Sequence, residues 1–147
     1  MTKPELENLF KVGRLKKEPP TRAEYEGLVG SARKRLADAQ NAVLSAESRF
    51  DLTYGAAHGL ALAALRREGY RSEHRYLVFL ALPHTVGMGA ADMRVLSKAH
   101  DVRNLAEYEG QADVDPQLLK DLIRCTVYLE RLVLALDPTP SQTFEPP

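Results

Sequence analysis

An alanine- and glycine-rich stretch near the middle of the chain most constrains its fold: SAESRFDLTYGAAHGLALAALRREGY, residues 45–70 of 147. Its apolar residues recur at steps of three and four, which is the period of one helix face that packs on a core. Ser45 or Ser48 is expected to cap the start of this helix and Gly69 to close it. Because small residues are so frequent on the stripe, we expect neighbouring helices to approach closely. The stripe consists of Phe50, Tyr54, Ala57, His58, Ala61, Leu62 and Leu65.

Two more helices are indicated by the residues at their starts. The stretch TRAE, residues 21–24, has the spacing of a capping box, in which the glutamate folds back onto the threonine. It predicts a helix over about residues 22–45. Asp115 followed by a proline favours the cap and first position of another helix, which we expect to run over about residues 116–136.

The remaining helices are indicated by the residues that end them. HRYLVFLAL, residues 74–82, could be a strand by propensity, but its helical surroundings favour a helix that ends at Pro83. We expect residues 83–89 to form a loop. Residues 90–109 again show the helical period, and Gly110 is expected to end them.

These segments predict an all-α fold, an up-and-down helical bundle of about five helices with short connections and no convincing strand. We expect residues 1–20 to form an N-terminal arm, residues 21–137 to form the bundle, and residues 138–147 to form a Pro-rich disordered tail. Neither the arm nor the tail is expected to contribute to stability.

Composition narrows the classes of function. Lys and Arg number 20, as do Asp and Glu, so any RNA-binding surface must be a local patch. No segment has the length of a membrane span and none resembles a secretory signal, so we expect a cytoplasmic protein. The single cysteine, Cys125, excludes an internal disulfide and is expected in the core. We find no phosphate loop, nucleophile elbow or metal-ligand pattern, and therefore expect no cofactor and no metal.

The stretch AHDVRNLAEYEG, residues 99–110, contains the candidate site. Arg103 falls on a stripe of small apolar residues, where an arginine must be paired or lie at an interface, because burying its charge alone costs several kcal/mol. Glu107, one helical turn later, is the obvious partner. The order of the pair and the position of the glutamate at a helix C-terminus are each unfavourable, by less than ~1 kcal/mol. Such departures from local consistency tend to mark functional sites.

The segment from about Thr21 to Leu136 resembles a HEPN domain, the helical domain of prokaryotic nucleotidyltransferase-associated proteins and RNase toxins. The residues that carry the resemblance are SRFDLTYGAAHGLALAALRREGYR, then HRYLVFLAL, then RNLAEYEG. Arg103 and Asn104 match the arginine and following polar residue that the family keeps. The resemblance implies a HEPN-like bundle that forms a homodimer, with the Arg-containing helices of both subunits around a shared cleft.

The same resemblance exposes a departure. Active HEPN ribonucleases follow that arginine with a histidine, whereas this chain has none after His100 and places Glu107 and Tyr108 there. A histidine, with a pKa of about 6.5, suits proton transfer at neutral pH, whereas a solvated glutamate at about 4.3 is a weak base. Arg103 and Asn104 can still hold a phosphate. The catalytic candidates are therefore Arg103, Asn104, Glu107 and, as a substitute for the missing histidine, His100.

Candidate ligand-binding residues extend beyond this stretch. With Arg103 and Asn104 they include Tyr108, whose ring can stack on a base, and Tyr54 and His58 of the central helix. For His58, a core or interface role is favoured over a catalytic one. A basic cluster around the end of the central helix is favoured as a solvated helix end, with an RNA-backbone patch as the alternative. It consists of Arg66, Arg67, Arg71 and Arg75.

Three functions compete. The leading hypothesis is an RNA- or nucleotide-binding or regulatory subunit of a toxin–antitoxin or defence-type system, without strong catalysis and partnered by a nucleotidyltransferase or a toxin. One alternative is a weak metal-independent endoribonuclease that uses Arg103 with Glu107 or His100. The other is a purely structural interaction subunit. The missing histidine favours the first and third hypotheses over the second.

Overall fold

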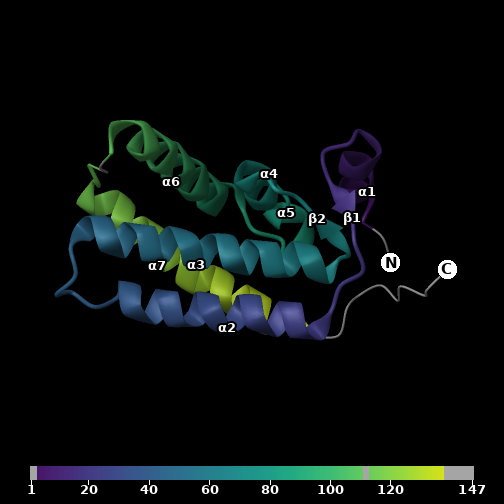
Figure 1. Cartoon of the computed structure of the whole chain (residues 1–147), viewed down its shortest axis with the longest axis horizontal. Coiled ribbons are helices and arrows are strands. Elements are labelled where there is room, and N and C mark those ends of the chain that lie inside the picture. The colour runs from purple at the N-terminus through teal and green to yellow at the C-terminus, as the bar shows by residue number, and fades with distance from the viewer. Residues whose placement is uncertain (1–2, 111–112, 138–147) are drawn as a thin grey trace.

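A computed structural model describes residues 3–110 and 113–137 and shows a predominantly helical molecule (Figure 1). Its helices are α1 (Pro4–Lys11), α2 (Arg22–Ala39), α3 (Ala46–Arg67), α4 (Arg75–Leu80), α5 (Leu82–Thr85), α6 (Ala90–Glu109) and α7 (Pro116–Leu134). Two short strands, β1 (Lys16–Lys17) and β2 (Tyr70–Arg71), pair antiparallel, with Lys16 opposite Arg71. The all-α prediction is confirmed, although this small ladder was not expected.

Helix α3 is the centre of the bundle. It lies antiparallel to α2 and packs against α4, α5, α6 and α7 (Figure 1). The close approach expected of its small residues is seen at Gly59, where an added Cβ atom would lie 3.4 Å from the Cβ of Ala32 on α2. Most of the predicted stripe is buried, with each of these side chains at most 3% exposed: Phe50, Tyr54, Ala57, Ala61 and Leu65.

The helix ends follow local side-chain chemistry. The Ser45 hydroxyl accepts a hydrogen bond from the backbone N–H of Ser48 (3.1 Å), and the Asp115 carboxylate accepts one from that of Gln117 (3.3 Å). Caps of this kind stabilise a helix by about 1 kcal/mol. Gly110 ends α6 in the left-handed conformation, at φ 78°. These predicted boundaries are confirmed.

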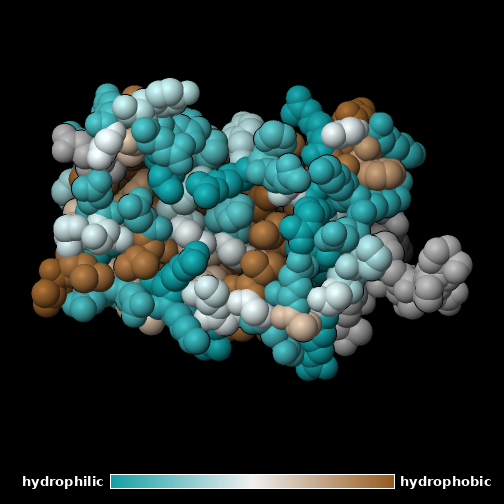
Figure 2. Space-filling model, viewed as in Figure 1, coloured by the Kyte–Doolittle hydropathy of each residue, from teal (hydrophilic) through white to brown (hydrophobic). Residues whose placement is uncertain are grey.

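Helix α2 is shorter than predicted. The expected helix over residues 22–45 ends at Ala39, although Val43 continues the apolar period. The Asn41 side chain accepts a hydrogen bond from the backbone N–H of Val43 (3.1 Å), a local turn that competes with the helix. Val43 is therefore 91% exposed, and apolar residues gather at the end where α2 and α3 are joined (Figure 2).

Pro83 also behaves differently from the prediction. We expected it to end a helix and begin a loop, yet it lies in the first turn of α5 (Leu82–Thr85). A proline is tolerated at that position because the N–H group it lacks has no partner within the helix.

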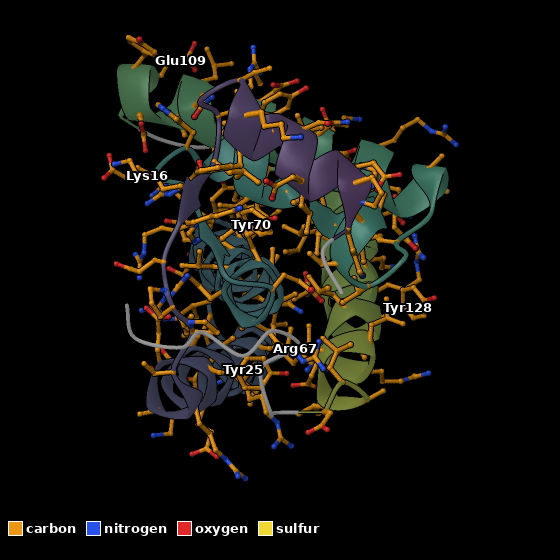
Figure 3. All side chains as sticks on the ribbon, turned by 90° about the vertical axis from the view of Figure 1, so that its right-hand side faces the viewer. Lys16, Tyr25, Arg67, Tyr70, Glu109 and Tyr128 are labelled. Carbon is orange, nitrogen blue, oxygen red and sulfur yellow. The ribbon has the colours of Figure 1, made fainter. Side chains whose placement is uncertain are left out.

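The expected N-terminal arm packs onto the bundle. Leu6 of α1 is fully buried and Leu15 is 2% exposed, and both belong to the same core cluster as Phe50. The Tyr70 hydroxyl donates a hydrogen bond to the Glu7 carboxylate (2.7 Å), and Figure 3 shows Tyr70 between α1 and the end of α3. We therefore now expect loss of this segment to destabilise the fold. The predicted tail, residues 138–147, lies outside the described residues.

The basic cluster predicted as a solvated helix end is largely used inside the molecule. Arg66 is 2% exposed, and its Nε donates to the Glu24 carboxylate at 2.7 Å. Its Nη1 donates to the carbonyl oxygen of Glu18 (3.0 Å), and Arg71 Nε donates to the Glu18 carboxylate (2.7 Å). The Thr21 hydroxyl caps α2 as predicted, by accepting a hydrogen bond from the Glu24 backbone N–H (3.1 Å), but the Glu24 carboxylate binds Arg66 instead of folding back onto Thr21. Arg75 is the member of this cluster that lines the candidate functional site.

Candidate functional site

A pocket of about 210 Å³ lies where α2, α4 and α6 meet α3. Its floor comes from one face of α3, because positions 51, 54, 55 and 58 follow the helical spacing of three and four. One arginine from each of the other three helices completes the wall. We call it the basic pocket; it is lined by Arg35, Asp51, Tyr54, Gly55, His58, Arg75 and Arg103.

Arg103 of α6 is the arginine that the sequence singled out. Its Nη1 atom lies 3.3 Å from Oε1 of Glu107, so the predicted pair within the helix is present. Its Nε atom lies 3.8 Å from Oδ1 of Asp51 on α3, a partner that the sequence did not reveal. The side chain is 29% exposed, so Arg103 lies at the pocket wall with its charge shared between two carboxylates and solvent.

Arg35 and Arg75 have no such partners. Within the described part of the chain, neither guanidinium forms an ion pair with a carboxylate. The guanidinium carbons of Arg75 and Arg103 lie 6.0 and 5.9 Å from the centroid of the Tyr54 ring, so both cations face one aromatic side chain. Arg35 reaches over Gly55, where a Cβ atom would lie 3.3 Å from its Nη1. The glycine thus leaves room for this guanidinium.

Tyr54 forms the buried floor of the pocket and is held by His100. The Tyr54 hydroxyl lies 3.0 Å from Nδ1 of His100, and Nδ2 of Asn104 lies 3.1 Å from Nε2 of the same ring. With the amide of Asn104 donating to Nε2, the ring proton is on Nδ1 and the phenol oxygen accepts it. The Tyr54 O–H group is then free to donate to a ligand. Burial raises the pKa of Tyr54, against the opposing charges of Arg75 and Arg103, so the phenol stays protonated.

His58 is a neutral member of the pocket. Burial, and then the charge of Arg75, lower the pKa of His58 to about 4. Its ring packs edge-on against Phe79, with centroids 6.0 Å apart. At neutral pH His58 therefore offers an uncharged imidazole, and its low pKa makes it a weak base. The groups that face it across the pocket are Arg35, Arg75 and Arg103, with Asp51 and Tyr54 on its own helix.

The other predicted site residues lie outside the pocket. Tyr108 is 92% exposed at the end of α6 and does not line it. Asn104 and His100 stand behind Tyr54 and hold it in place. The structure therefore brings Arg103, Tyr54 and His58 together as ligand candidates and gives Asn104 and His100 a positioning role.

Sequence reasoning missed several lining residues. Asp51 lies three residues before Tyr54 and Gly55 three residues before His58, so both border the apolar stripe of α3 at helical spacing, a signal that was available in the sequence. Arg35 gave no comparable signal, since its place depends on how α2 and α3 are aligned. Arg75 was noticed, but within a cluster whose other members have structural partners.

The arrangement is suited to binding an anion. Guanidinium groups from three helices, a phenol and a neutral imidazole supply hydrogen-bond donors, and Asp51 is the one carboxylate among the lining residues. Across the described ranges, no group of three or more His, Cys, Asp or Glu side chains is placed to hold a metal ion. Nor does any helix within those ranges combine the length and the apolar character needed to cross a membrane.

Comparisons of the chain with protein-family models, with curated proteins and with solved structures found no match. Any function assigned to the protein therefore rests on the basic pocket and the surfaces around it.

Proposed function

We propose that this protein binds a phosphate-bearing ligand, RNA or a nucleotide, in the basic pocket, and acts as a binding or regulatory subunit without strong catalysis. One observation carries the proposal. Arg35, Arg75 and Arg103 reach the same small pocket from three separate helices, and the first two form no ion pair within the described ranges.

The charge balance of the pocket favours an anion. Three guanidinium groups stand against two carboxylates, that of Asp51 in the lining and that of Glu107 paired with Arg103, so positive charge is in excess and the cations repel one another. A phosphate group relieves this repulsion and can accept bidentate hydrogen bonds from a guanidinium. Because the whole chain has a formal net charge of zero, affinity must come from this local group and should weaken with salt.

Of the side chains near the pocket, Glu107, His58 and His100 are poor proton acceptors for cleavage at neutral pH. Glu107 is 54% exposed and paired with Arg103, while the pKa of His58 is lowered to about 4. Both ring nitrogens of His100 already have hydrogen-bond partners, Tyr54 and Asn104. These contacts favour binding over the alternative of a weak endoribonuclease. The HEPN-like relationship, the homodimer and a nucleotidyltransferase or toxin partner stay predictions.

Incubation of the pure protein with mixed RNA, with and without a chelator, separates binding from cleavage. We expect salt-sensitive RNA binding, intact RNA and no effect of the chelator. Arg103→Ala should weaken binding, whereas Glu107→Ala should leave it unchanged or strengthen it, because a competing anion 3.3 Å from Arg103 is lost. Robust cleavage that is lost in Glu107→Ala would instead make this protein an enzyme.

A further inference from the structure

A second pocket, of about 200 Å³, lies between α4 and α6. Almost all of its lining is apolar, and no carboxylate takes part. Tyr76, whose ring is 46% exposed, forms part of its wall, and Arg94 and Ser97 add polar groups. We call it the apolar pocket; its other main lining residues are Phe79, Met93 and His100.

The two pockets are joined through His100. Its ring centroid lies 6.4 Å from that of Tyr54 in the basic pocket, with the two rings 24° from parallel. The ring centroid of Tyr76 lies 5.6 Å from that of His100. Arg75 of the basic pocket directly precedes Tyr76 in α4, and Arg103 lies one turn of α6 beyond His100. The two pockets therefore lie next to one another along α4 and α6, with the ring of His100 between them.

We propose that the apolar pocket holds the base of a nucleoside monophosphate whose phosphate lies in the basic pocket. This inference rests on the proposed function and names its ligand class. The exposed Tyr76 ring offers a face on which a base can stack, and stacking of this kind is a major source of affinity for nucleotides. Arg94 and Ser97 also line this pocket and are exposed, so their polar ends are free to turn toward the edge of a bound base.

Charge favours this occupant over a peptide or a second copy of the chain. The one charged side chain that lines the apolar pocket is a cation, Arg94, and the adjoining basic pocket adds three arginines. A terminal phosphate carries close to two negative charges at neutral pH, and it suits a pocket where three guanidinium groups outnumber the carboxylates of Asp51 and Glu107. An apolar side chain alone would fill one pocket and leave these cations uncompensated.

Calorimetric titration with AMP, ribose 5-phosphate and inorganic phosphate tests the inference. Ribose 5-phosphate shares the sugar and phosphate of AMP and lacks only the base. We expect AMP to bind about tenfold more tightly than ribose 5-phosphate, the size of gain typical of one stacked base. Because a larger ring stacks more strongly, AMP should also bind more tightly than UMP.

Two variants test whether the tighter binding of AMP comes from the apolar pocket. Tyr76→Ala removes the stacking face, and Ser97→Trp, at an exposed helical position, fills the pocket without removing core contacts. Both should bring the affinity for AMP down to that for ribose 5-phosphate and leave the latter unchanged. Tyr128→Ala is the matched control. Tyr128 lies on α7 (Figure 3), is 42% exposed and lines neither pocket.

The outcomes separate this inference from the proposed function. Equal binding of AMP and ribose 5-phosphate by the wild type would overturn the base site while leaving phosphate binding intact. If both Tyr76→Ala and Ser97→Trp still bind AMP more tightly than ribose 5-phosphate, the inference is also overturned, since the base would then lie elsewhere. If neither these ligands nor RNA bind, both proposals fail. A changed oligomeric state in Tyr76→Ala, with no AMP preference in the wild type, would identify the apolar pocket as a protein contact instead.

Discussion

The Tyr54 hydroxyl lies 3.0 Å from Nδ1 of His100, which links the floor of the basic pocket on α3 to the wall of the apolar pocket on α6. The same imidazole is held from its other nitrogen by Asn104. Tyr54 is 3% exposed, so its orientation is fixed by packing as well as by this hydrogen bond. A residue that the sequence suggested as a catalytic substitute, His100, therefore supports Tyr54, which we propose as a ligand-binding residue.

The hydrogen bond between Tyr54 and His100 can be tested through the free energy of unfolding. Tyr54→Phe removes the partner of His100 Nδ1 in a buried setting and should lower the free energy of unfolding by about 1 kcal/mol. Tyr76→Phe, which loses a hydroxyl group at an exposed position, should change it by less than about 0.5 kcal/mol. Urea unfolding followed by circular dichroism measures both. Equal effects of the two substitutions would show that the Tyr54–His100 hydrogen bond contributes nothing.

A larger effect is expected at the buried arginine of α3. Arg66→Met should lower the free energy of unfolding by about 3 kcal/mol, because three backbone carbonyl groups lose their arginine donor and Glu24 keeps only Arg71. Arg33→Met breaks an ion pair with Glu130 whose arginine side chain is 58% exposed, and should cost under about 1 kcal/mol. The same denaturation experiment compares them. A tolerated Arg66→Met would mean that the cluster is a solvated helix end after all.

The N-terminal segment gives a third comparison. Leu6→Ala should destabilise the protein by about 2–5 kcal/mol, as expected for a fully buried leucine whose removal leaves a cavity. Leu105→Ala, on the outer face of α6 and 56% exposed, should change the free energy of unfolding by less than about 0.5 kcal/mol. Thermal unfolding would reveal the difference. An unchanged melting temperature in Leu6→Ala would restore the view of residues 1–20 as a dispensable arm.

Stability should depend on pH through His58. The pKa of His58 is lowered to about 4 in the folded protein, against about 6.5 in an unfolded chain. As the pH falls below about 6.5, the unfolded chain takes up a proton that the folded protein excludes, so the free energy of unfolding decreases. The decrease ends near pH 4, where folded His58 is also protonated, and amounts to at most about 3 kcal/mol.

The contribution of His58 is the difference between the wild type and a His58 variant in the free energy of unfolding, measured between pH 7 and pH 4. His58→Gln should flatten the part of the profile that lies below pH 6.5, whereas His74→Gln, at an exposed position, should keep the slope of the wild type. Identical profiles for the wild type and His58→Gln would contradict a His58 that stays neutral in the folded protein.

The helices could be predicted from sequence because their signals are local. The cap at Ser45 and the glycine at residue 110 each act within one helical turn, and both were correctly placed. Val43 shows the limit of the apolar period, since it continued the pattern and yet lies exposed beyond the turn formed by Asn41. The packing of Leu6 could not be predicted either, because a short amphipathic segment does not specify which surface it will cover.

The site was predicted only in part, for a related reason. Arg103 and Glu107 lie one turn apart on the same helix, so their pairing follows from spacing. Tyr54 and His58 were suggested by the stripe of α3. Their meeting with Arg35 depends on the alignment of α2 against α3, and no local signal specifies it. The HEPN resemblance directed attention to Arg103, and the pocket around it came from the tertiary structure.

Binding of a short RNA with a 5′-phosphate to Arg75→Gln tests most directly whether the basic pocket is a phosphate site. Arg75 has no ion pair within the described ranges, so its loss removes a ligand contact and no carboxylate partner. Lys98→Gln is the control, because it removes one positive charge from an exposed position of α6 that lines neither pocket.

Fluorescence anisotropy across a series of salt concentrations gives the affinity and its salt dependence for each protein. We predict that Arg75→Gln binds about tenfold more weakly than the wild type and has a shallower salt dependence, as expected when one charged phosphate contact is lost. Lys98→Gln should match the wild type. Equal affinities for the wild type and Arg75→Gln, or an equal loss in both variants, would contradict phosphate binding in the basic pocket.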